Sequence, residues 1–169
     1  MTDVVVIGGG VIGLSIAREL SISGKEIIVL EKNERAGDVT SSRNSGVIHA
    51  GIYYPKNFLK TKLCIEGNKL IYEYAKEKNI IHKKYGKYII ASNKKELSNL
   101  EAILIQGKKN KDNVSKAKKE EVLKNNPGLV FHAALYSPNS GVIDVPEYVT
   151  ALEGDIQHFG GLISLRTSF

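Results

Sequence analysis

Cysteine is almost absent from this chain of 169 residues, where Cys64 stands alone. An internal disulfide is therefore excluded, and a lone thiol is typical of a protein in a reducing cytoplasm. No apolar run approaches the roughly 20 residues that a membrane-spanning helix needs. The first residues enter an apolar segment without a basic stretch before it, so we expect no signal peptide and a cytoplasmic location. Internal repeats and low-complexity segments are also absent.

Negative charge is in deficit, since 24 lysine and arginine residues against 18 acidic ones give a net charge of +6. The cations are mostly lysines in short runs such as Lys83–Lys84 and Lys94–Lys95. None of these runs carries the aromatic platform that a single-strand binder needs. We therefore expect a solvated lysine-rich surface and no nucleic-acid partner. The apolar fraction of 42% supports a packed core, and the length suits one domain of ordinary size.

A glycine-rich turn near the N-terminus is the most informative feature that is present. Val4–Ile7 is a β-branched run that predicts a buried strand, and Gly8–Gly13 follows it directly. Apolar residues then recur at helical spacing up to Gly24, and Ile27–Leu30 predicts a second buried strand that ends at Glu31. This order of strand, glycine turn, helix, strand and acid is typical of a dinucleotide-binding site.

Each part of that unit has a chemical reason. Gly8 permits the tight turn, Gly10 lets the backbone approach a pyrophosphate, and Gly13 lets the helix pack closely on the strand. The helix N-terminus offers N–H groups and the positive end of its dipole to the phosphates. Glu31 can accept hydrogen bonds from a ribose 2′-hydroxyl, and its charge repels a 2′-phosphate. A strand–helix turn without a ligand is the alternative, and the unit alone does not distinguish FAD from NAD.

The rest of the chain alternates helical and extended patterns. Helices are expected over four segments: 57–78, 94–111, 120–125 and 144–159. Strands are expected over four others: 47–55, 80–91, 133–136 and 162–165. Gly86 is expected to mark a bend or bulge. Asp144, with Glu147 three residues on, predicts a capping-box-like helix start.

These patterns predict an α/β fold with an inserted region. Residues 1–55 and 145–169 are expected to form a Rossmann-type dinucleotide-binding domain. Residues 56–144 are expected to form part of an inserted α+β domain that contacts the substrate.

A second signature runs from Thr40 to Pro55 and is most specific over Asn44–Tyr54. Together with the glycine turn, it resembles the FAD-dependent oxidoreductases of the D-amino-acid-oxidase-like superfamily, and within them the L-2-hydroxyglutarate oxidase/dehydrogenase branch. The resemblance continues over nearly the whole chain, through these segments: Leu59–Lys60, Leu63–Cys64, Glu66–Asn68, Tyr72–Tyr74, Gly86–Lys87 and Ser140–Asp144.

The resemblance implies FAD as the cofactor and a set of residues that hold it. Those residues are Gly8, Gly10, Val11, Ile12, Gly13, Glu31, Lys32, Ser41, Ser42, Arg43, Asn44, Ser45, Gly46, Val47 and His49. Within this set Glu31 would hold the adenosine ribose, with Lys32 near the adenine. Residues 41–44 would line the phosphate and ribityl part. Beside the isoalloxazine ring would run Ser45, Gly46, Val47 and His49. The other interpretation of 41–45 is a polar surface loop.

Several residues near the expected flavin keep two interpretations. His49 would be catalytic if it orients substrate, carries a proton or tunes the ring, and it is otherwise a structural histidine. Tyr53 and Tyr54 are expected either to face the substrate or only to pack against neighbouring residues. Cys64 lies in a helical apolar pattern and is expected in the core. The other histidines share no metal-ligand spacing, so no metal site is expected.

The resemblance implies oxidation of a small 2-hydroxy acid, such as L-2-hydroxyglutarate, to the 2-oxo acid by hydride transfer to the flavin. Two alternatives stay open. One is an amino-acid or amine oxidase, or a relative of glycerol-3-phosphate dehydrogenase, and the other is a non-catalytic dinucleotide-binding module that needs a partner chain. Nothing indicates the electron acceptor.

Members of this family are longer, so the resemblance implies an N-terminal portion. A core-like strand lies just before Phe169. We therefore expect weak FAD binding, self-association, or dependence on a C-terminal half.

Overall fold

The computed structural model describes residues 1–169, which form two compact units. The first unit comprises Met1–Gly46, Glu77–Ile81 and Ile143–Phe169. The second comprises Val47–Lys76 and His82–Val142. The second unit is therefore an insertion in the sequence of the first, and the short segment 77–81 divides it.

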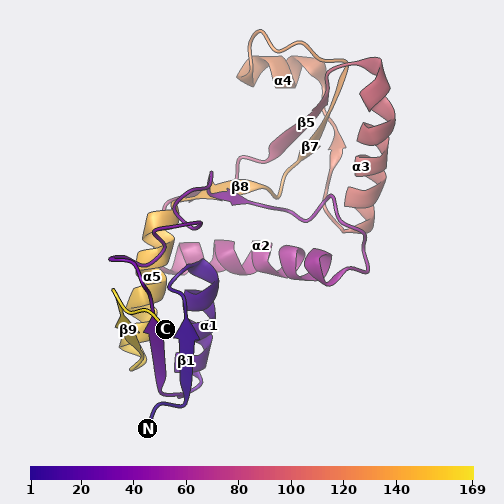
Figure 1. The fold of residues 1–169 in the computed structure, drawn as a ribbon. Coiled ribbons are helices and arrows are strands. Elements are labelled where there is room, and N and C mark those ends of the chain that lie inside the picture. Colours follow the sequence, from indigo (N-terminus) through magenta and orange to yellow (C-terminus); the bar gives the residue numbers. More distant parts are fainter. The chain divides into compact units, whose positions relative to one another are not determined.

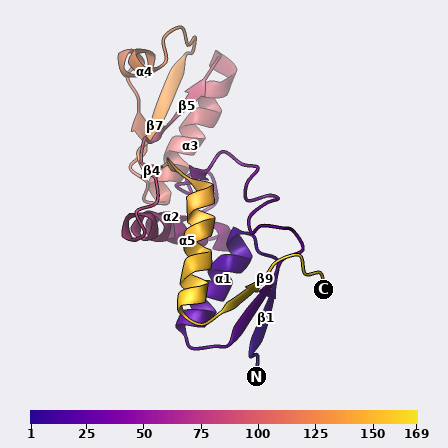
Figure 2. The same cartoon turned by 90° about the vertical axis from the view of Figure 1, so that its left-hand side faces the viewer.

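The first unit is built on a three-stranded parallel sheet with the strand order β1-β2-β9. Its strands are β1 (Val4–Ile7), β2 (Ile27–Leu30) and β9 (Leu162–Ser164). Helix α1 (Val11–Ile22) connects β1 to β2, and α5 (Val145–His158) precedes β9. The two helices pack against each other and against the strands, as Figure 2 shows for α1, α5 and β9.

Only one face of this sheet is buried. Ile27 and Val29 are 2% and 0% exposed, whereas Val5 and Ile7 are 50% and 63% exposed. Side chains alternate between the two faces of a strand, so the helices cover the face that carries Ile27 and Val29. The expectation of a fully buried first strand is therefore wrong for Val5 and Ile7.

Local signals place the helices of the first unit. Gly10 is the extended residue before α1, and Leu14 and Ala17 lie on the buried face of that helix. Asp144 caps α5, because its Oδ1 accepts a hydrogen bond of 2.9 Å from the Glu147 N–H. This cap confirms the helix start that was expected at Asp144.

The second unit contains two small sheets, of which the first has the order β3-β8-β4. Its strands are β3 (Val47–Ile48), β8 (Gly141–Ile143) and β4 (His82–Lys83). The second sheet is antiparallel, with the order β5-β7-β6. Its strands are β5 (Lys87–Ala91), β7 (Ala133–Ser137) and β6 (Ser115–Lys116).

Helices α2 (Leu59–Glu77), α3 (Leu97–Lys109) and α4 (Lys119–Asn125) accompany these sheets, with a short 3₁₀ turn over Lys94–Glu96. Figure 1 shows α3 running beside β5 and β7. Two clusters form the core of the unit: Ala91, Leu100, Leu104, Val114 and Leu135, and Val122, Phe131 and Ala134.

Gly86 separates the two strands of the region expected to be extended over 80–91. Its φ of 73° lies in the left-handed region, and the space that a Cβ would take is filled by the Tyr136 ring. The bend expected at this glycine is therefore confirmed. One other expectation fails, since Cys64, which was expected in the core, is only partly buried. No helix in the structure combines the length and the apolarity needed to cross a membrane.

Candidate dinucleotide-binding site

The glycine turn between β1 and α1 is fixed by steric contact. Gly8 has a φ of 103°, which few other residues adopt, and its N–H donates a hydrogen bond of 2.8 Å to the Leu30 carbonyl of β2. A Cβ at position 13 would overlap the Gly8 carbonyl group. The chain therefore turns tightly into α1 and brings the helix N-terminus, with its outward N–H groups, to the end of the sheet.

Glu31 lies directly against this turn. Its Oε2 accepts a hydrogen bond of 2.7 Å from the Gly9 N–H, and its Oε1 accepts two from Asn33, at 2.8 Å from the N–H and 2.6 Å from Nδ2. Burial on its own raises the pKa of Glu31, but the hydrogen bonds from Asn33 and Gly9 outweigh it and hold the pKa below its usual range. Glu31 is thus an ionised acceptor, and Oε2 retains capacity for a further donor such as a ribose hydroxyl.

A cavity of about 480 Å³ adjoins Glu31. It is lined by Ile7, Gly8, Glu31, Lys32, Asn33, Val39, Thr167, Ser168 and Phe169. The Thr167 N–H donates a hydrogen bond of 2.9 Å to the Glu31 carbonyl, which holds the last residues beside the end of β2. The cavity has apolar walls and one carboxylate, a combination that suits a nucleoside. The sequence did not indicate Asn33 or Thr167.

The loop that follows β2 contributes Ser41 to the turn. The Val11 N–H of α1 donates a hydrogen bond of 3.1 Å to Ser41 Oγ, and a Cβ on Gly10 would lie 3.3 Å from that oxygen. Asn44 shapes the loop, since its Nδ2 donates to the Ser41 carbonyl at 2.6 Å and its Oδ1 accepts from the Gly46 N–H at 2.8 Å. The structure therefore brings Ser41 to the start of α1. Three other expected residues, Ser42, Arg43 and Ser45, are exposed.

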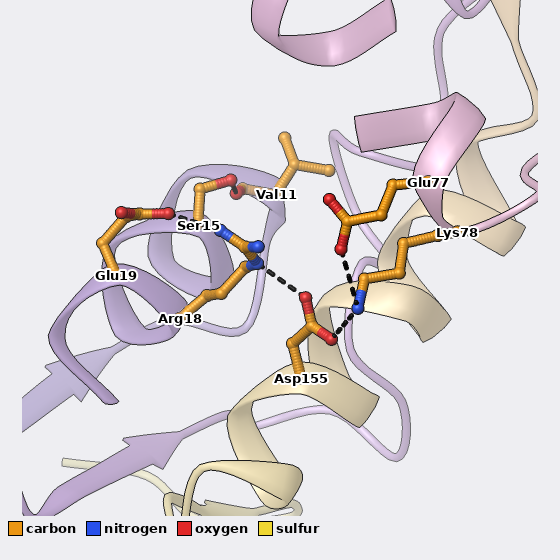
Figure 3. A network of polar contacts seen from close by, with 7 residues as sticks. All are labelled: Val11, Ser15, Arg18, Glu19, Glu77, Lys78 and Asp155. Carbon is orange, nitrogen blue, oxygen red and sulfur yellow. Dashed lines mark hydrogen bonds and ion pairs between the residues drawn. The ribbon is translucent and has the colours of Figure 1, made fainter. Parts of the chain in front are cut away.

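An ion-pair network anchors α1 within the first unit (Figure 3). Asp155 of α5 has a side chain that is only 8% exposed and lies between two cations. Arg18 Nε donates to its Oδ2 at 2.7 Å, and Lys78 Nζ donates to its Oδ1 at 2.6 Å. Lys78 also pairs with Glu77 at 3.5 Å. The buried carboxylate thereby joins α1, α5 and the segment 77–81, and fixes the helix whose N-terminus forms the turn.

Val47 and His49, the last two of the expected site residues, belong to the second unit. The His49 carbonyl accepts a hydrogen bond of 3.0 Å from Asn68 Nδ2, whereas its side chain is exposed. Partial desolvation of the ring and then the positive charges of Lys87 and Lys60 lower the pKa of His49. The ring is therefore neutral near pH 7 and able to accept a proton. No group of three His, Cys, Asp or Glu side chains in residues 1–169 is arranged to hold a metal ion.

Comparison with known proteins identifies a family that matches this chain. Residues 3–168 match the family model described as FAD dependent oxidoreductase. The L-2-hydroxyglutarate dehydrogenase of Arabidopsis thaliana is 44% identical over 151 residues, which are 89% of this chain and 31% of that protein. The human enzyme of the same name is 36% identical over 170 residues, or 99% and 36% of the two chains. The chain thus spans about a third of the length of these relatives.

Solved structures give the same fold. The L-alpha-glycerophosphate oxidase of Mycoplasma pneumoniae with FAD bound superimposes with a TM-score of 0.89 at 32% identity, over 97% of this chain and 44% of that one. The glycine oxidase of Geobacillus kaustophilus superimposes with a TM-score of 0.86 at 24% identity, over 97% and 46%. At 24% identity, the match to the glycine oxidase is evidence for the fold alone.

Proposed function

Because this chain belongs to the family of FAD-dependent oxidoreductases, we propose that it is the N-terminal, cofactor-binding portion of an enzyme that oxidises L-2-hydroxyglutarate or a similar small 2-hydroxy acid to the 2-oxo acid. The observation that carries this proposal is the 44% identity to a protein named L-2-hydroxyglutarate dehydrogenase. FAD supplies the chemistry when bound, since it accepts a hydride from the substrate carbon. The protein residues bind and orient the reactants.

The turn, the acid and the adjacent cavity fit the cofactor. Gly8, Gly10 and Gly13 would hold the pyrophosphate together with the first N–H groups of α1, at Val11 and Ile12. Glu31 would accept a ribose hydroxyl, and Lys32 would lie at the adenine, because both line the cavity of about 480 Å³. The remaining members of the proposed site are those that follow the second strand: Ser41, Ser42, Arg43, Asn44, Ser45, Gly46, Val47 and His49. The Ser41 contact with the start of α1 supports their place near the phosphates.

His49 is proposed to accept the proton of the substrate hydroxyl group. Its lowered pKa keeps the ring neutral near pH 7, as a general base requires. A structural role is the alternative, and activity of a His49→Gln variant in an otherwise complete enzyme distinguishes the two. Loss of about a hundredfold or more in kcat is expected for a general base.

We also propose the domain roles and partners that the sequence suggested. Residues 1–55 and 145–169 would bind FAD, and residues 56–144 would form part of the substrate domain. Self-association or a C-terminal half would complete the enzyme, and nucleic acid would not bind at physiological salt in a gel-shift assay. A cytoplasmic location is proposed on the lone cysteine. The matched relatives are named mitochondrial, so fractionation of cells that express the tagged protein tests it.

The test of function compares this chain with a form extended by a C-terminal half taken from a matched dehydrogenase. Both are assayed with L-2-hydroxyglutarate and a dye as electron acceptor, beside glycerol 3-phosphate and alanine as alternative substrates. We expect the extended form to oxidise L-2-hydroxyglutarate and the short chain to be slower. Oxidation of glycerol 3-phosphate or alanine in preference to L-2-hydroxyglutarate would overturn the proposed substrate.

A further inference from the structure

Two lysines from distant parts of the second unit converge on the segment that follows β3. Lys87, the first residue of β5, places Nζ 4.5 Å from the centroid of the Tyr53 ring. Lys60, in the first turn of α2, places Nζ 4.2 Å from the centroid of the Tyr54 ring. Both distances fall within the range of a cation–π contact. The two ammonium groups are therefore held over adjacent tyrosines, a few residues after His49.

The charge of these two lysines is not neutralised within the protein. Neither Lys60 nor Lys87 is among the lysines that form ion pairs, in contrast to Lys78 and Lys116. A tyrosine ring orients an ammonium group but leaves N–H donors and the full positive charge available. Lys87 is also partly buried, which makes an unpaired charge at that position more costly.

His49 lies within the field of both cations. After burial, the positive charges of Lys87 and Lys60 are the causes that lower the pKa of His49, and no acidic residue opposes them. The same two lysines act on the Cys64 thiol, whose Sγ lies 3.7 Å from the His49 carbonyl oxygen. Two positive charges, those of Lys87 and Lys60, therefore act on His49.

We propose that Lys60 and Lys87 are the anion-binding residues of the substrate site and select a dicarboxylate. This inference rests on the proposed function, because it assigns the lysines to the substrate that His49 would receive. The two ammonium groups lie over separate rings, so each can pair with one carboxylate of a dicarboxylate, whereas glycerol 3-phosphate carries its negative charge on a single group. The ammonium group of a zwitterionic amino acid is repelled by both lysines. Tyr53 and Tyr54 act as positioning residues, since they hold the two ammonium groups in place.

Binding of a substrate-sized dianion to the 169-residue chain tests the proposal without turnover. The probe is glutarate, and the readout is the imidazole NMR signal of His49 in protein labelled at histidine, with alanine and glycerol 3-phosphate as competing chemistries. We expect a saturable shift of the His49 signal with glutarate and binding of alanine that is about tenfold weaker or less. The double variant Lys60→Met, Lys87→Met should weaken glutarate binding by about tenfold or more. The matched control Lys62→Met changes an exposed lysine of the same helix and should leave binding unchanged.

Several results would overturn the assignment. They are no glutarate-dependent shift, an equal affinity in the double variant, or tighter binding of alanine or glycerol 3-phosphate than of glutarate. The double variant Lys60→Arg, Lys87→Arg preserves the positive charge and should retain at least part of the glutarate affinity. Circular dichroism spectra of the methionine and arginine double variants should match that of the wild type. A loss of binding in the methionine variant is then caused by the lost charge and not by unfolding.

The same lysines can be tested in the extended enzyme, where the two proposals fail differently. If L-2-hydroxyglutarate is oxidised, Lys87→Met should raise its KM by about tenfold with a smaller change in kcat. An unchanged KM there rejects the lysine site and leaves the function intact. Glutarate binding that depends on the lysines, without oxidation of L-2-hydroxyglutarate, rejects the function and leaves the anion site intact.

Discussion

Gly9 donates a backbone hydrogen bond of 2.7 Å to Oε2 of Glu31, which joins the glycine turn to the acid at the end of β2. A Cβ at position 9 would lie 3.1 Å from the Glu31 Cβ, closer than side-chain carbons normally approach. The middle one of the three consecutive glycines, Gly9, therefore has a role of its own, since it lets the acid lie against the backbone. A change in either residue is expected to affect the other.

Glu31→Gln should remove the part of the folding stability that depends on the ionised carboxylate of Glu31. The pKa of Glu31 is lowered in the folded chain, so its contribution is present above the unfolded value of about 4.5 and is lost as the pH falls through the folded value. The free energy of unfolding should fall by about 1–3 kcal/mol at neutral pH and by less in acid. Urea denaturation over a range of pH measures this difference. Glu34→Gln, an exposed acid of the same loop, is the control, and an equal pH profile for both variants would reject the role of Glu31.

Gly13→Ala should damage the turn, because the added Cβ overlaps the Gly8 carbonyl, which is backbone and cannot move aside. We expect a loss of roughly 1–3 kcal/mol in the free energy of unfolding, together with weaker FAD binding. Gly154→Ala is the matched control within the same unit. It lies in α5 with open space at the Cβ position, so it should stabilise the helix by roughly 0.5–1 kcal/mol. Thermal denaturation of the two variants checks the opposite signs.

Asp155→Asn should be among the most destabilising conservative changes in the first unit. The substitution leaves Arg18 and Lys78 beside a neutral amide, and losing one partner of a buried ion pair costs about 3–5 kcal/mol. Glu19→Gln removes a contact with the same Arg18, but the Glu19 side chain is 70% exposed, so a cost below about 1 kcal/mol is expected. Chemical denaturation that finds equal effects would show that the network in Figure 3 contributes little.

Asn110→Ala should loosen the segment that carries Tyr53 and Tyr54. The Asn110 side chain is buried, and its Nδ2 donates hydrogen bonds of 2.8 Å and 2.9 Å to the carbonyls of Gly51 and Tyr54. Their loss leaves two acceptors without a donor, at a cost of about 1–3 kcal/mol. Amide hydrogen exchange over residues 51–54 should become faster. The exposed Asn113→Ala is the control and should leave the exchange unchanged.

Local signals predicted much of this fold. The family, the α/β class and FAD as cofactor were inferred from the glycine turn and the segment Thr40–Pro55, and all three are confirmed. The bend at Gly86 and the helix cap at Asp144 could also be predicted from the sequence, because a left-handed glycine and a capping side chain depend on neighbouring residues in the chain.

Tertiary contacts could not be predicted from such local signals. Asp155 reads as a polar residue of an amphipathic helix, yet its partners Arg18 and Lys78 are 137 and 77 positions away. Thr167 reaches the cavity only because β9 pairs with β2. The exposure of Val5 depends on which face of the sheet the helices cover, and a run of four apolar residues does not encode that choice.

The dinucleotide that the chain prefers is the most direct test of the account. The purified protein is titrated with FAD by quenching of flavin fluorescence, and with NAD⁺ by calorimetry. We predict that FAD binds about tenfold or more tightly than NAD⁺, and that Glu31→Ala weakens FAD binding by about 1–3 kcal/mol. Tighter binding of NAD⁺ than of FAD, or an FAD affinity that Glu31→Ala leaves unchanged, would contradict the cofactor site described for this chain.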